Sequence, residues 1–292
     1  METTPAEPRS DPAPGLSPTA QLVRRHDRDR FQTALFAPAE RREALFALYA
    51  FNYEIARVRE AVSEPMLGQI RLQWWRDAIA AAYAGEPPRR HEVVLPLTEA
   101  IRERGLDRAS LDRLVDARER DLNPEPPPSL AALEHYTEGS SAELVLLALE
   151  TLGTREPEAR AAARSVGIGY ALAGLLRAMP FHARVGRNYI PAEIAAATGL
   201  DPADYAAGRG TPALRAAVAK IAAAAERNLA AARQQKGAVP RGAIAAVLPA
   251  VIAERYLKRL RRAGHDPFAP QLALPDPLQA WRLLAASLLR RY

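Results

Sequence analysis

Strong helix formers fill this chain from Thr19 to its last residue, and no other feature limits its possible folds as much. Alanine, leucine, arginine and glutamate recur throughout this stretch, and all four have high intrinsic helix propensity. Few segments alternate apolar and polar residues in the way that half-buried strands do. The sequence therefore predicts an all-α fold. It shows no fixed-period repeat and no shift in composition, which predicts a single domain.

Proline- and glycine-rich segments divide this stretch into predicted helices. The predicted helices are 19–36, one that starts near Pro38 and includes 52–60, then 64–83, 91–104, 110–122, 129–137, 140–152, 158–185, 211–235, 239–263 and 278–292. Pro180 is expected to kink the helix that contains it, and 211–235 is expected to pair antiparallel with 239–263. Residues 1–18 mix prolines with acidic residues and are predicted to form a disordered tail before the domain of residues 19–292.

The composition excludes several kinds of chemistry. The chain has no cysteine, which excludes disulfides, cysteine-ligated clusters and thiol catalysis. Its net charge of +6 and pI near 9.8 fit contact with an anionic membrane surface, nucleic acid or an anionic ligand. The same charge equally fits an arginine-rich proteome. No nucleic-acid motif appears, so nucleic acid is not an expected partner. No apolar stretch reaches the roughly 20 residues that a membrane span needs.

Two segments carry recognisable motifs. Residues 47–60 read ALYAFNYEIARVRE, and residues 175–191 read LLRAMPFHARVGRNYIP. They resemble the two signature regions of the squalene/phytoene synthase family, whose enzymes read ALYAFCRxxDDxxD and ILRDVxEDxxRGRxYLP. Residues 69–76 and 136–145 are similar to two further helices of that family. The resemblance implies an isoprenoid-synthase-type helical bundle in which the two motif segments face each other across a central cavity.

The aspartates of both motifs are missing from this chain. In the family's enzymes, acids on the two helices hold Mg²⁺, which neutralises the charge of the departing diphosphate. The matching positions here are Ala56, Glu60, Ala178 and His182. Alanine offers no ligand, and histidine suits softer transition metals than Mg²⁺. We therefore expect no catalytic residue, no metal site and no cofactor.

Basic and polar residues at the motifs suggest a ligand all the same. Arg177, Arg184 and Arg187 accompany the second motif, and arginine binds phosphate oxygens without a metal. With Asn52 and Tyr189, they complete the predicted cavity lining, whose ligand would be a prenyl diphosphate or an anionic lipid. The same three arginines could equally well be ordinary charged residues at helix ends and on the surface, without a ligand.

Several departures from the enzyme pattern recur in one branch of the family. Residues 50–54 (AFNYE), 62–64 (VSE) and 176–182 (LRAMPFH) resemble the AFNxE, VSE and LRAxPxH of that branch, whose mitochondrial members assist the assembly of respiratory complex I. Because this chain shares these differences from the enzyme motifs with that branch, they argue against a random loss of the motif residues. The resemblance implies a bacterial relative in the cytoplasm, in peripheral contact with the inner membrane, with subunits of a respiratory complex as partners.

Three functional hypotheses follow, and we adopt the first, a non-catalytic assembly or lipid-binding factor. The second is an active prenyltransferase that condenses two prenyl diphosphates at an altered Mg²⁺ site. It would need replacement acids near the cavity, and Glu54, Glu60 and Glu143 are the only plausible ones. The third is a helical interaction protein without a cavity.

Three further patterns are open to a functional or a structural interpretation. The C-terminal helix carries Trp281 and Leu288 on one side, and it either docks on a membrane or packs on the core. Acids and arginines interleave over residues 112–121, which predicts a solvated, ion-paired helix face. Gly167 is interpreted as a close contact between helices rather than as part of a phosphate loop.

Overall fold

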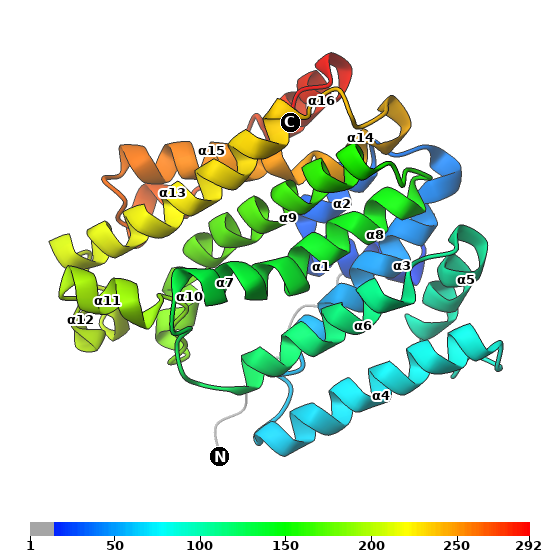
Figure 1. Cartoon of the computed structure of the whole chain (residues 1–292), viewed down its shortest axis with the longest axis horizontal. Helices are drawn as coiled ribbons and strands as arrows, with labels where there is room; N and C mark the ends of the chain where they lie inside the picture. The colour runs from blue at the N-terminus through cyan, green and yellow to red at the C-terminus, as the bar shows by residue number, and fades with distance from the viewer. Residues whose placement is uncertain (1–14) are drawn as a thin grey trace.

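The computed structural model describes residues 15–292, and no strand occurs in this range, which confirms the all-α prediction. The helices form one domain (Figure 1). In chain order they are α1 (Pro18–His26), α2 (Arg28–Ala34), α3 (Ala39–Ala56), α4 (Pro65–Ala84), α5 (Val94–Arg104), α6 (Arg108–Ala117), η1 (Arg118–Leu122), α7 (Leu130–Thr137), η2 (Glu138–Ala142), α8 (Glu143–Thr151), α9 (Pro157–Arg177), α10 (Met179–Arg184), α11 (Ala192–Thr198), α12 (Pro202–Ala206), α13 (Pro212–Gln234), η3 (Arg241–Ala243), α14 (Ile244–Val247), α15 (Pro249–Arg262), η4 (Pro270–Leu272) and α16 (Gln279–Leu289). The tail predicted for residues 1–18 falls mostly on residues 1–14, which lie outside the described residues.

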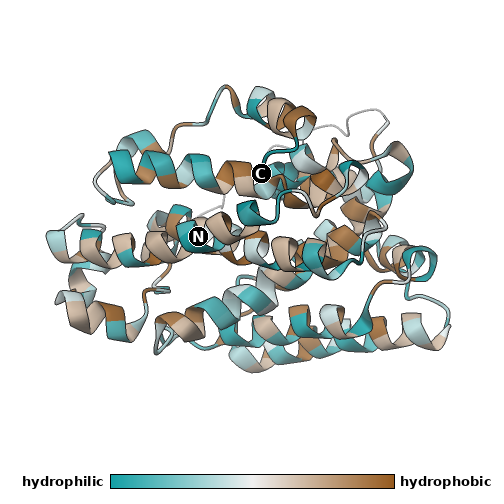
Figure 2. Ribbon diagram, turned by 45° about the horizontal axis from the view of Figure 1, so that its top comes forward, coloured by the Kyte–Doolittle hydropathy of each residue, from teal (hydrophilic) through white to brown (hydrophobic). Residues whose placement is uncertain are grey.

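Helix α9 lies at the centre of the bundle, because α7, α8, α13 and α15 all pack against it. On the other side of α8, α3 packs against α1 and α5. Helix α4 covers α5 and α6 at one edge of the molecule, and α16 lies on α15 at the opposite edge (Figure 1). Hydrophobic residues are spread along all of these helices rather than gathered at one end (Figure 2). None of the described helices combines the length and the apolar character that a membrane crossing requires.

The predicted helix 19–36 is in fact two helices, α1 and α2. Asp27 separates them, with a non-helical φ of −137° and ψ of 69°. Its carboxylate accepts a hydrogen bond from the backbone N–H of Arg30 and pairs with the Arg30 guanidinium at 2.7 Å. An aspartate that caps the first turn of a helix stabilises a start at that point, so the prediction of one continuous helix was wrong.

Both motif helices are shorter than predicted. Helix α3 ends at Ala56, and Glu60, which was expected on the same helix, lies exposed in the turn that follows. Helix α9 ends at Arg177, so the predicted kink at Pro180 is a complete break at Ala178. Proline lacks an N–H and its ring collides with the carbonyl four residues earlier, which prevents a continuous helix through this point.

Other boundaries differ for similar reasons. The predicted helix 140–152 begins within the π-helical turn η2, where α9 comes very close. A Cβ on Gly167 would overlap the Cα of Ala142, which confirms the predicted close contact between helices. The predicted helix 239–263 is divided before Pro249 into η3, α14 and α15. The short helices α11 and α12 were not predicted.

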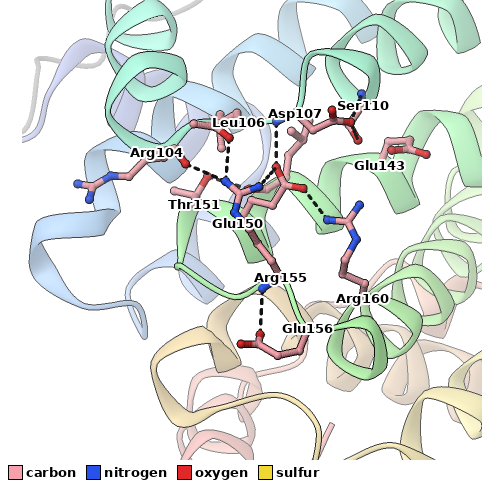
Figure 3. A network of polar contacts seen from close by, with 12 residues as sticks. Arg104, Leu106, Asp107, Ser110, Glu143, Glu150, Thr151, Arg155, Glu156 and Arg160 are labelled. Carbon is pink, nitrogen blue, oxygen red and sulfur yellow. Dashed lines mark hydrogen bonds and ion pairs between the residues drawn. The ribbon is translucent and has the colours of Figure 1, made fainter.

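A buried carboxylate joins several loops to the bundle. The side chain of Glu150 on α8 is 1% exposed and pairs with Arg160 of α9 at 2.5 Å. It also accepts a hydrogen bond from the backbone N–H of Asp107 at 3.0 Å and lies 3.6 Å from Arg155 (Figure 3). Arg155 in turn donates to the carbonyls of residues 104 and 105. These contacts fix the turn before α6 against α8 and α9, so this acid has a structural role.

Candidate functional site

Asn52 of the first motif segment takes part in a buried polar network. The Oδ1 atom of Asn52, buried on α3, accepts a hydrogen bond from the guanidinium of Arg118 in η1 at 3.1 Å. The same guanidinium donates to the carbonyl of Ser140 at 3.2 Å and to the phenolic oxygen of Tyr136 at 3.3 Å. Arg118 therefore holds α3, η1, η2 and α7 in fixed relative positions.

Asp121 connects this network to the second motif segment. Its carboxylate accepts hydrogen bonds from the hydroxyls of Tyr136 at 2.8 Å and Tyr189 at 2.7 Å. It lies 3.5 Å from Arg118, and the two side chains are only 6% and 12% exposed. Arg187 donates to the backbone carbonyl of Asp121 at 2.8 Å. The two motif segments are thus bridged by a buried ion pair and two tyrosines.

The tyrosines of the network are held as hydrogen-bond donors. Burial raises the pKa of Tyr136, and the charge of Asp121 raises it further. Burial likewise raises the pKa of Tyr189, with Tyr136 and Asp121 adding to the shift. Both phenols therefore stay protonated at neutral pH, and each keeps a proton to donate to the carboxylate.

His182 stands where the enzymes of the family have the last aspartate of the second motif. It is nearly buried, and its ring lies 4.9 Å from the Tyr189 ring and 5.9 Å from the Phe181 ring, measured between centroids. Burial, and secondly the charge of Arg187, lowers the pKa of His182 to about 4. The imidazole is therefore uncharged at neutral pH. A neutral, ring-packed imidazole does not replace a carboxylate ligand of Mg²⁺.

The other positions that hold metal ligands in the family's pattern provide no buried ligating side chain in this chain. Ala56 and Ala178 are half-buried and carry no ligating atom, and Glu60 is exposed outside α3. Within residues 15–292, no group of three or more histidine, aspartate or glutamate side chains is placed to hold a metal ion.

The two other replacement acids are already paired. Glu54 forms an ion pair with Arg57 at 3.4 Å. Glu143 is buried on α8, and both of its oxygens accept hydrogen bonds from Arg113, at 2.8 and 3.0 Å. The sequence suggested Glu143 as a replacement acid near the cavity, but Arg113 of α6 neutralises its charge. Neither acid belongs to the network of Asn52 and Arg118.

Arg177 does not join the buried network. It pairs with Asp29 of α2 at 2.7 Å. Asp29 also accepts hydrogen bonds from the amide of Gln279 at 3.1 Å and from the hydroxyl of Tyr170 at 3.4 Å. This cluster therefore joins α2, α9 and α16. The network thus contains three of the predicted site residues, Asn52, Arg187 and Tyr189, and His182 packs on the Tyr189 ring. Arg177 lies apart from the network, and among the described residues no side-chain hydrogen bond connects the network with Ala56, Glu60 or Ala178.

A groove of about 670 Å³ opens beside Arg177. Its walls come from α1, α2, α9, α10, α15 and the segment 267–279. Arg28, Arg177 and Arg184 line it together with the apolar side chains of Phe181 and Ile252. Within the described part of the chain, Arg28 and Arg184 have no acidic partner. An anionic head group beside an apolar tail suits such a lining.

Sequence reasoning missed the two residues at the centre of the network. Arg118 and Asp121 were assigned to a solvated helix face, and the structure buries both. The assignment is correct for Asp116, which pairs with Arg76 at the surface. The one signal in the sequence was Leu122, an apolar residue between Asp121 and the proline-rich segment 123–128. In the structure Leu122 is buried, and Arg118 begins the 3₁₀ turn η1. A change of direction at that point turns the last residues of the segment inward.

The comparisons with known proteins agree with this geometry. The sequence model of the squalene/phytoene synthase family matches residues 23–283. The mouse (Mus musculus) protein named NADH dehydrogenase (ubiquinone) complex I, assembly factor 6, is 32% identical over 272 residues, which are 93% of this chain and 81% of that protein. The presqualene diphosphate synthase of Rhodopseudomonas palustris is 28% identical over 191 residues, 64% of this chain and 67% of the synthase.

A solved structure has the same fold. The squalene synthase HpnC from Alicyclobacillus acidocaldarius matches with a TM-score of 0.76 at 22% identity, over 85% of this chain and 94% of that one. This likeness confirms the isoprenoid-synthase-type helical bundle. The family match covers most of the chain, and both motif segments lie within it. The chain therefore belongs to the squalene/phytoene synthase family.

Proposed function

We propose that this protein is a non-catalytic member of its family that assists the assembly of a respiratory NADH dehydrogenase. One observation carries the proposal. The positions that hold metal ligands in the family's enzymes are here two alanines, an exposed glutamate and a neutral, buried histidine. Nothing at these positions neutralises the charge of a departing diphosphate, which the condensation of prenyl diphosphates requires. The likeness to complex I assembly factor 6 supports the choice of role.

The buried network indicates a structural role for the altered motifs in place of metal binding. In an enzyme, carboxylates around a metal must stay accessible to substrate. Here Arg118 pairs with Asp121 and donates to Asn52, and Asp121 accepts from Tyr189, so the two motif segments become parts of a fixed scaffold. Such a scaffold suits a protein that holds or presents a partner. We propose subunits of the respiratory complex as partners, and no metal or cofactor.

The groove beside Arg177 supplies a ligand site for the same role. We propose that it binds an anionic amphiphile, such as an acidic lipid or a prenyl diphosphate, without reacting. Arg28 and Arg184 have no acidic partner among the described residues and are free to contact phosphate oxygens. Phe181 and Ile252 offer an apolar wall for a hydrocarbon chain. The proposed location is the cytoplasmic face of the inner membrane, reached by peripheral contact.

A gene deletion tests the role. We expect a deletion strain to lose most of its assembled NADH dehydrogenase on a native gel and to keep normal squalene, hopanoid and carotenoid levels. The wild-type gene should restore the complex. The double variant Arg28→Gln/Arg184→Gln should restore it less well, whereas Arg262→Gln, which changes an exposed arginine outside the groove, should restore it fully.

The second candidate is a prenyltransferase with an altered site, which the likeness to a presqualene diphosphate synthase favours. Purified protein incubated with farnesyl diphosphate and Mg²⁺ separates the two candidates. We expect binding that the groove variants weaken, and no product above a protein-free control. Product formation in this assay, or a deletion strain with a normal complex and depleted isoprenoids, would favour the enzyme instead.

A further inference from the structure

Helix α16 is apolar on two opposite sides, and only one of them is covered. Leu283 and Ala286 pack into the core, at 0% and 8% exposed. Trp281 and Leu288 are each 69% exposed. Residues two apart on a helix point about 200° away from each other, so Trp281 lies nearly opposite Leu283. The sequence left open whether this helix packs on the core or docks on a membrane, and the structure leaves an apolar side free for docking.

The exposed side forms a continuous ridge. Trp281, Leu284 and Leu288 follow one another at helical spacing, and Leu278 continues the row toward the preceding loop. Helix α16 lies at the edge of the molecule, near the C-terminus (Figure 1). A monomeric soluble protein seldom leaves so many large apolar side chains together on one helix unless they bind something.

The charges around the ridge are basic. The chain has no acidic residue after Asp276, and Asp276 is itself paired with Arg255 at 3.3 Å and Arg282 at 3.6 Å. At the other end, Arg290 donates to the carbonyl of Val239, and the Tyr292 hydroxyl donates to the carbonyl of Gln235.

These two bonds bring the loop between α13 and α14 to the C-terminal end of α16. The exposed cations there are Lys236, Arg241 and Arg291, and none has an acidic partner within residues 15–292. Unpaired cations beside an apolar ridge complement a surface that is both anionic and apolar. A bilayer that contains acidic phospholipids is such a surface.

We propose that α16 is a membrane-docking helix that inserts Trp281 and Leu288 into an anionic bilayer interface, with Lys236, Arg241 and Arg291 on the head groups. The ridge belongs to a helix too short to span a bilayer, so the contact lies in the plane of the interface. This inference rests on the peripheral membrane contact of the proposed function and names its surface. Its test is separate, because vesicles report docking in the absence of any respiratory subunit or prenyl diphosphate.

Co-sedimentation of the full chain with vesicles tests the apolar part of the proposal. We expect binding to phosphatidylcholine vesicles that contain phosphatidylglycerol, with a blue shift of the tryptophan fluorescence that is absent from Trp281→Ser. Trp281→Ser and Leu288→Gln should each weaken binding about ten-fold, since each removes a largely exposed apolar side chain from the interface. The matched control is Ile70→Gln, which changes a residue 60% exposed at the opposite edge of the molecule and should not weaken binding. Circular dichroism checks that every variant is folded.

The charge part has its own readout. Lys236→Gln, Arg241→Gln and Arg291→Gln should each weaken binding roughly five-fold at low salt, and high salt should remove the difference. The exposed Arg262→Gln, on another helix, serves as control. Equal binding to pure phosphatidylcholine, or an equal loss with Ile70→Gln, would overturn the proposal. So would a dimer in light scattering that Trp281→Ser dissociates, without vesicle binding, because a second copy would then cover the ridge.

Discussion

Replacing Arg118 with methionine tests whether the buried network holds the two motif segments together. Methionine keeps much of the side-chain volume but removes the charge and the hydrogen bonds to Asn52 and the carbonyl of Ser140. Asp121 would keep its two tyrosine donors and lose its counter-charge while 6% exposed. Breaking a buried pair costs about 3–5 kcal/mol. The long Arg118–Asp121 distance of 3.5 Å and the remaining donors place this case at the lower end, at about 3 kcal/mol.

Urea unfolding followed by circular dichroism measures this cost. With a slope of about 3 kcal/mol per molar, the midpoint should fall by about 1 M. The double variant Arg118→Met/Asp121→Leu should recover much of the loss, because replacing both partners of a buried pair by apolar groups is often nearly neutral.

An exposed arginine serves as the matched control for the same substitution. Arg164 is 53% exposed and pairs with Glu138 at 2.7 Å, so Arg164→Met should change the free energy of unfolding by less than about 1 kcal/mol. If Arg118→Met costs no more than Arg164→Met, the network does not hold the motif segments and our interpretation of it is wrong.

Three further predictions follow from single contacts. The unfolded state protonates His182 more readily than the folded state, so the free energy of unfolding should fall as the pH drops from 6.5 to about 4. His182→Phe should flatten this pH dependence in urea unfolding. An unchanged dependence would contradict the lowered pKa of His182. Gly167→Ala should lower stability by roughly 3 kcal/mol through overlap with the backbone of η2. Gly174→Ala on the same helix has open space and should raise stability by up to about 1 kcal/mol. Urea unfolding measures both variants, and equal effects of the two would refute the clash. Ala56→Asp/Ala178→Asp should still show no Mg²⁺-dependent turnover of farnesyl diphosphate, because Glu60 lies outside α3 and His182 remains in the second motif. Product formation would show that two added acids are enough for activity.

The sequence alone determined the all-α fold class and the absence of the family's motif aspartates. Alanine, leucine, arginine and glutamate each favour the helix only weakly, but their preferences add up over long segments and together indicate the fold class. The motif residues around positions 56 and 178 identified the family and showed that two metal ligands are absent. Neither conclusion depends on distant contacts, which is why both could be reached from one chain.

Only the tertiary structure decided where each charge lies. Arg118 and Arg164 both sit in helical segments rich in charge, yet one is buried against Asp121 and the other is exposed. Whether an arginine is buried depends on the helices that pack over it, and periodicity within one segment carries no information about them. Position 60 shows the same limit, because residues 57–60 form a turn after the end of α3 although their sequence favours a helix. The free side of α16 likewise became visible only once Leu283 was seen to occupy the core, since burial of one side of a helix is a property of its neighbours.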